Sequence, residues 1–123
     1  MSDLRHNETV LSGSDMLYQQ MVICAAQACE GWATILFEGT LDLLLWPTDR
    51  GDFPHGPAYR VNTRVIQRGV WRVALQAELP AGVDQADRDA VIKAETALSA
   101  SQIPFPTINK VVQCGLFAEV LYR

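Results

Sequence analysis

Residues 33–46, ATILFEGTLDLLLW, decide the fold of this chain. Two apolar runs flank Gly39-Thr40, a pair that suits a two-residue type II′ turn, so the stretch predicts a β-hairpin. Such a turn would pair Leu36 with Leu43. Both faces of the hairpin would then be apolar, so one face can pack on a helix while the other needs a second cover, such as another subunit.

A second hairpin is predicted further along the chain. Residues 58–67 and 70–79 alternate apolar and polar side chains with the period of a strand, and a short connection with a bulge at Gly69 would join them. The last segment, residues 108–122, indicates another hairpin that turns at Cys114-Gly115, or one long strand kinked at the glycine. The chain is therefore expected to form a mainly antiparallel sheet of four to six strands.

Two helices are also predicted, one before the first hairpin and one between the second hairpin and the last segment. The first spans about residues 15–30 and is apolar around most of its circumference, which favours deep burial or cover by a partner. The second spans about 85–100, begins at an Asp84 cap and is stopped by the prolines at 104 and 106. The expected fold is α+β, with the two helices packed on the sheet. Residues 1–13 read as a flexible arm, and residues 14–123 as one domain.

The composition restricts the function. The chain has 123 residues, 49% of them apolar, which suits one domain with a packed core. The net charge is −4 and the basic residues are dispersed, which argues against a nucleic-acid partner. No apolar run approaches the ~20 residues of a membrane span, and residues 1–15 lack a signal-peptide core, so synthesis in the cytoplasm is expected. The three cysteines are expected to be buried free thiols, with a catalytic thiol as the alternative.

The longest break between strand-like segments is Trp46–Arg60, WPTDRGDFPHGPAYR. It places Asp49, Asp52 and His55 at intervals of three, and carboxylate and imidazole groups suit metal binding or acid–base chemistry. A glycine and a proline within the loop prevent a helix from aligning these groups, and no further ligands lie near in the sequence. Common nucleotide-binding and hydrolase motifs are also missing. We therefore expect no cofactor, no metal and no catalytic residue.

A loop of this length inside a small domain is usually functional, so we expect it to be a contact surface. Arg60, Arg64 and Arg72 are predicted on the outward face of the second hairpin, where they form a solvated face or, alternatively, hold phosphate or an acidic partner. The predicted interface consists of Trp46, Asp49, Arg50, Asp52, Phe53, His55, Tyr59, Arg60 and Arg64.

The second half of the chain resembles a family of phage proteins in its order of elements. DFPHGPAYRV leads into a strand, WRVALQAELPAG gives a strand with a Pro/Gly exit, DQADRDAVIKAETALSA gives an amphipathic helix and GLFAEVLYR a final strand. This order, over roughly residues 52–123, is similar to the small tail-terminator and tail-completion proteins of long-tailed bacteriophages. The resemblance implies a homo-oligomeric ring, a hexamer in that family, that binds tail-tube and neck proteins and has no catalytic residues.

The leading hypothesis is thus a structural assembly protein of a phage tail or neck. It would be cytoplasmic in the host during assembly and part of the virion afterwards. The alternative is a small phage- or plasmid-encoded inhibitor that binds a host or defence protein. A small enzyme using residues 49–55 is the third hypothesis.

Overall fold

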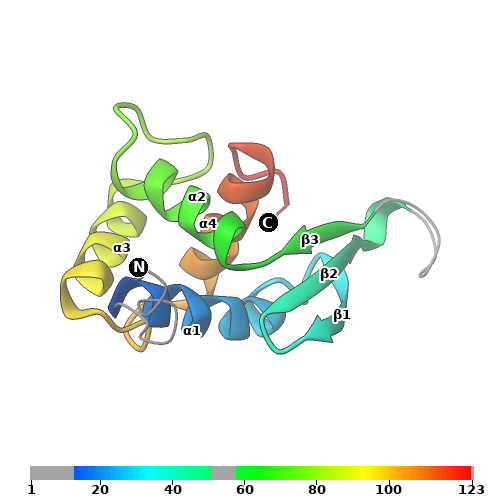
Figure 1. Cartoon of the computed structure of the whole chain (residues 1–123). Helices are drawn as coiled ribbons and strands as arrows, with labels where there is room; N and C mark the ends of the chain where they lie inside the picture. The colour runs from blue at the N-terminus through cyan, green and yellow to red at the C-terminus, as the bar shows by residue number, and fades with distance from the viewer. Residues whose placement is uncertain (1–12, 51–57, 123) are drawn as a thin grey trace, which may run out of the picture.

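The computed structural model describes residues 13–50 and 58–122, and within these ranges the chain forms four α-helices and a three-stranded antiparallel sheet. The helices gather into one body, and the sheet extends from one end of it (Figure 1). The elements in order are α1 (Gly13–Ala28), β1 (Ala33–Gly39), β2 (Asp42–Pro47), the 3₁₀ turn η2 (Thr48–Arg50), β3 (Tyr59–Val61), α2 (Thr63–Ala74), α3 (Gln85–Ala97) and α4 (Phe105–Phe117).

The α+β character is confirmed, but the expected sheet of four to six strands with two helices is wrong. Residues 63–74 form α2, and only Tyr59–Val61 of the expected second hairpin is a strand. Asn62 starts the helix, because its side-chain oxygen accepts the backbone N–H groups of Arg64 at 3.1 Å and Val65 at 3.2 Å. The buried side of α2 follows the helical period: Val65, Ile66, Gly69, Val70, Val73 and Ala74.

The expected C-terminal strand or hairpin is also a helix, α4. Pro104 is its N-cap and Pro106 lies in its first turn, where the missing N–H of proline is tolerated. The two prolines therefore start this helix, and the predicted α3 already ends at Ala97. The buried residues of α4 begin at helical spacing and then run consecutively, so the second half of the helix is buried around most of its circumference: Thr107, Ile108, Val111, Val112, Gln113, Cys114 and Gly115.

Two glycines let α2 and α4 approach closely, and this pair makes the most extensive helix–helix contact. A Cβ at Gly69 would lie 2.0 Å from the carbonyl oxygen of Val111, and one at Gly115 would lie 2.2 Å from that of Val65. Both are far inside van der Waals contact. The predicted bulge at Gly69 and turn or kink at Gly115 are therefore wrong, since both glycines lie within helices and serve their packing.

Arginine side chains satisfy the carbonyl groups at the ends of these helices. Arg68 Nε donates to Gly115 O at 2.7 Å, and Arg72 Nη1 donates to Cys114 O at 2.6 Å. Arg88 of α3 does the same for α2, where it donates to Val73 O and Gln76 O. These cations meet the negative ends of the helix dipoles. The expected outward row of Arg60, Arg64 and Arg72 is thus not formed, because Arg72 ties α2 to α4.

The sheet register differs from the predicted one by a single residue. Leu36 pairs with Leu44, and the register shifts between Phe37 and Gly39, so Glu38 is an extra residue in β1. The predicted pairing of Leu36 with Leu43 ignored this bulge. A slip of one residue turns a side chain to the other face, so Leu36 shares a face with Leu44.

An aromatic cluster joins the sheet to the helical body. Trp32 stacks on Tyr122 at a centroid distance of 4.5 Å, and Phe117 meets Tyr59 edge-on at 5.0 Å. The buried Gln113 holds the C-terminal segment in this place. Its amide donates to Tyr122 O at 2.7 Å, and its oxygen accepts the N–H groups of residues 121 and 122 at 2.8 and 2.7 Å.

The two helices predicted from sequence are confirmed. α1 covers Gly13–Ala28 and buries an apolar stripe of Leu17, Met21, Val22 and Ala25. α3 begins at the predicted Asp84 cap, whose side chain accepts the N–H of Asp87 at 2.9 Å.

Candidate functional site

The strands bury one face of the sheet and leave the other face open. Leu36, Leu44 and Arg60 lie in one row across the three strands, and Thr34 pairs with Trp46 in the next row. Opposed residues in an antiparallel ladder share a face, so these five side chains form what we call the sheet outer face. The buried residues of the strands all belong to the inner face: Ala33, Leu43, Leu45, Pro47 and Val61.

The sheet outer face is largely apolar, although a face in contact with water is normally polar. Leu36 is 42% exposed, and Leu44 and Trp46 are partly exposed. Phe37, near the hairpin tip, is 57% exposed but pairs with Leu43 and therefore belongs to the inner face. An antiparallel sheet with one covered face normally turns polar side chains to water on the other. Contiguous exposed apolar residues are typical of a surface that another protein covers.

The edge of the sheet beside Leu36 is open as well. Within the described residues β1 pairs with β2 alone, so one row of its backbone groups faces outward. Natural edge strands usually block such pairing with lysine, proline or a bulge. β1 contains neither lysine nor proline, and its bulge at Glu38 lies near the tip. Residues 33–37 therefore form a regular edge to which another strand can be added.

Arg60 forms a charged cluster with two acidic side chains at one end of this face. Its guanidinium donates to Asp42 Oδ2 at 2.5 Å and lies 3.6 Å from Glu38 Oε1. The hydrogen bond and charge of Asp42, followed by the charge of Glu38, raise the pKa of Arg60 above its usual value. All three side chains remain solvent-exposed. The cluster therefore places charge beside the apolar face and adds little to stability.

The residues of the sequence-predicted interface are dispersed over several surfaces. Trp46 and Arg60 lie on the sheet outer face, whereas Tyr59 lies on the inner face against Phe117. The remaining members are placed as follows: Asp49 accepts from the Tyr122 hydroxyl at 3.3 Å, Arg50 ends η2, Arg64 belongs to the first turn of α2, and Asp52, Phe53 and His55 lie outside the described residues.

Sequence reasoning missed Leu36 and Leu44 as surface residues. The available signal was the hairpin with two apolar faces, which already required a second cover. We placed the contact in the loop instead, because its aspartates, arginine and histidine resemble a functional site more than two leucines do.

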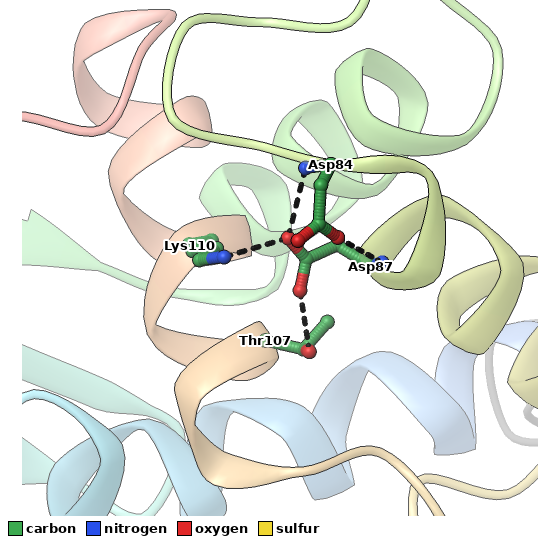
Figure 2. A network of polar contacts seen from close by, with 4 residues as sticks. All are labelled: Asp84, Asp87, Thr107 and Lys110. Atoms are coloured by element: carbon green, nitrogen blue, oxygen red, sulfur yellow. Dashed lines mark hydrogen bonds and ion pairs between the residues drawn. The ribbon is translucent and has the colours of Figure 1, made fainter.

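A second polar cluster lies in the helical body, where Asp87 links α3 to α4 (Figure 2). Asp87 is only 6% exposed. Its carboxylate accepts hydrogen bonds from Thr107 Oγ1 at 2.7 Å, Lys110 Nζ at 2.7 Å and the Asp84 N–H at 3.0 Å. Every donor points at the charge, so this buried acid is fully satisfied.

These contacts determine the ionisation of Asp87. Burial on its own would raise the pKa of the carboxyl group, but the hydrogen bonds from Lys110, the Asp84 N–H and Thr107, with the charge of Lys110, together hold the pKa below its ordinary value. Asp87 is therefore ionised at neutral pH. It serves as the N3 partner of Asp84 in the capping box and as an anchor for α4.

The described residues offer little for nucleophilic or metal chemistry. Burial raises the pKa of Cys29 to about 12 and that of Cys114 to about 11, so both are protonated thiols at neutral pH. Over 13–50 and 58–122, no three His, Cys, Asp or Glu side chains gather as a metal site would require. The helices in these ranges are also too short or too polar to cross a bilayer.

Comparison of the chain with protein-family models, curated protein sequences and solved structures returned no match. Support for a function therefore comes from the sequence and the geometry of this chain.

Proposed function

We propose that this protein is a structural assembly protein that associates with copies of itself through the sheet outer face and the edge of β1. The observation that carries the proposal is Leu36, which lies 42% exposed at the junction of an apolar face and an unpaired strand edge. An isologous contact uses the same patch on both copies, and a strand edge is a common patch of this kind.

Antiparallel pairing of β1 with a second β1 fits the sequence of the strand. If the two strands pair about Leu36, the leucines of the two copies face each other and the two outer faces become one apolar surface. Glu38 of each copy then lies opposite Thr34, so no like charges are opposed. The contact would bury Leu36 and satisfy the outward backbone groups of β1 together.

Sedimentation equilibrium over a wide concentration range tests this proposal. We expect the wild-type chain to associate reversibly and Leu36→Lys to remain a monomer, because a buried unpaired ammonium group opposes the contact. The matched control is Ile92→Lys on α3, since Ile92 has the same exposed fraction of 42%. It should associate like the wild type.

Two results would contradict the proposal: a wild-type chain that stays monomeric at every concentration, or equal loss of association in both variants.

The phage-tail role is a narrower form of the same proposal. It rests on the sequence resemblance, whose expected order of strand, strand, helix and strand differs from the observed order of strand and three helices over residues 59–117. Co-sedimentation of the purified protein with phage tail tubes would test it, with Leu36→Lys as the comparison. Recovery of neither protein with the tubes would end this narrower hypothesis and leave self-association as a separate question.

A further inference from the structure

A small cavity lies on the helical body. It has a volume of about 200 Å³ and is lined by Gly82, Pro106, Asn109, Lys110, Val120 and Tyr122. These residues come from the turn before α3, the first half of α4 and the C-terminal segment. The volume corresponds to about seven water molecules in the liquid. It is below the ~300 Å³ at which drug-sized sites begin, so the cavity suits a small molecule.

One polar wall of the cavity is Asn109, whose amide orientation is fixed by its neighbours. Its Oδ1 accepts from Trp32 Nε1 at 2.7 Å and from Gln113 Nε2 at 2.9 Å. The Cys29 thiol also points at this oxygen, at 3.6 Å. Indole N–H can only donate, so the oxygen must face Trp32 and the NH₂ group must face away. This NH₂ group makes no hydrogen bond to the described residues and is a free donor.

The second polar wall is Lys110, which is held in position by Asp87. One N–H of its ammonium group is used at 2.7 Å from Asp87 Oδ2, and the side chain is 26% exposed. An ammonium group has three N–H donors, and among the described residues only one of them has a partner, so two can bind a ligand. Asp87 itself is 6% exposed and both of its carboxylate oxygens already accept hydrogen bonds, as Figure 2 shows, so it fixes the lysine and does not line the cavity.

The remaining walls are apolar and preformed. Gly82 has φ +89° and packs so closely that an added Cβ would lie 2.6 Å from Val120 Cβ. The N–H of Val120 donates to Ala81 O at 2.9 Å, which closes the C-terminal segment onto the turn. Pro106 and the ring of Tyr122 complete the apolar lining, and the Tyr122 hydroxyl is used by Asp49.

We propose that this cavity binds a small carboxylate with an apolar tail. Its two polar side chains, Asn109 and Lys110, both present donors, so the ligand must supply acceptor atoms at one end and apolar atoms at the other. The charge of Asp87 offsets part of the charge of Lys110, which favours a singly charged carboxylate over a phosphate dianion. The site is separate from the sheet outer face and does not depend on self-association.

Titration of the ¹⁵N-labelled protein with sodium benzoate tests the proposal by NMR. We expect saturable shifts of the amide signals of Gly82, Asn109, Lys110 and Val120. Benzyl alcohol, which keeps the ring and lacks the carboxylate, and inorganic phosphate should each bind at least about tenfold more weakly, since a hydrogen bond to a charged group contributes roughly 1.5–3 kcal/mol.

Three variants locate the site. Lys110→Met should weaken benzoate binding about tenfold or more. The matched control is Lys93→Met, at the only other lysine of the chain, which lies exposed on α3 and should bind as the wild type does. Because Lys110→Met also leaves Asp87 without its ion pair, Val120→Phe is the second test: it keeps the pair, fills the cavity and should abolish saturable binding.

The proposal is overturned if benzoate shifts do not saturate, if benzyl alcohol or phosphate binds as tightly as benzoate, or if Val120→Phe binds like the wild type.

Discussion

Backbone and apolar groups are packed and paired at the α2–α4 contact, but are left partly exposed on the sheet outer face. At the helix contact, backbone lies on backbone at Gly69 and Gly115, and arginine side chains satisfy the terminal carbonyl groups. On the sheet outer face, Leu36 keeps 42% of its surface in water and the edge of β1 lacks a strand partner in the described chain. The contacts of the helix pair therefore all stabilise the folded monomer. The apolar surface left in water on the sheet can still contribute free energy when it is buried by a partner.

The largest expected effect comes from filling the close approach of the helices. Gly69→Ala should lower the free energy of unfolding by about 3 kcal/mol, because the new methyl group meets the Val111 carbonyl in a packed contact. The gain in helix propensity of about 1 kcal/mol from Gly to Ala does not offset this clash. Urea unfolding followed by circular dichroism measures the difference.

Gly31→Ala is the control for this comparison, since a Cβ at Gly31 has no atom within 4 Å. It should unfold within about 0.5 kcal/mol of the wild type. Equal stability of the two variants would show that α2 and α4 do not pack as closely as described.

Gly69 also explains much of what the sequence did not reveal. Residues 70–79 alternate as a strand does, with Trp71, Val73 and Leu75 on one side. The same residues also fit a helix, in which buried residues recur in pairs from Val65 to Ala74. That helical pattern has no gap only if Gly69 is counted as a core residue. A glycine has no apolar side chain to be counted, and its role depends on a partner helix about 45 residues away. Tertiary packing therefore decided this segment, and local pattern did not.

The elements with local signals were predictable. The Asp84 cap and the apolar helix α1 are encoded within a few residues, and both were predicted. The β1–β2 hairpin was predicted with its register wrong by one, since Gly39 was assigned to the turn, whereas it ends β1 next to the bulge at Glu38. For the candidate site, the need for a cover over the hairpin was predictable. Which leucines stay exposed depended on that register.

A smaller effect is expected from the Asp87 cluster. Asp87→Asn should lower the free energy of unfolding at neutral pH by about 2 kcal/mol, because Lys110 loses its ion pair and the Asp84 N–H loses its charged acceptor. Asp89→Asn, on the exposed side of the same helix, is the matched control and should change stability by less than about 0.5 kcal/mol. If the two variants are equally stable, the cluster does not link α3 to α4 as its geometry indicates.

The same cluster predicts how stability depends on pH. The folded-state pKa of Asp87 lies below the unfolded value of about 3.8, so its contribution is complete above that pH. As the pH falls below about 4 and through the folded-state pKa, the contribution is lost. The difference in unfolding free energy between wild type and Asp87→Asn should therefore shrink from pH 6 toward pH 3, roughly. A difference that stays constant over this range would assign the effect to packing instead of charge.

The smallest effect on stability, and the one that tests the comparison most directly, is expected at Leu36. Leu36→Ala should lower the free energy of unfolding of the monomer by about 1 kcal/mol or less, since 42% of Leu36 already lies in water. Leu43→Ala removes the same atoms from a fully buried position on the inner face and should cost about 3 kcal/mol. Thermal and urea unfolding at low concentration, where the chain is monomeric, measure both. A large loss at Leu36 in the monomer would mean that the chain itself covers this leucine, and the sheet outer face would then belong to the core. A small loss of unfolding free energy, together with weaker association, would mean that Leu36 serves binding and that folding does not require it.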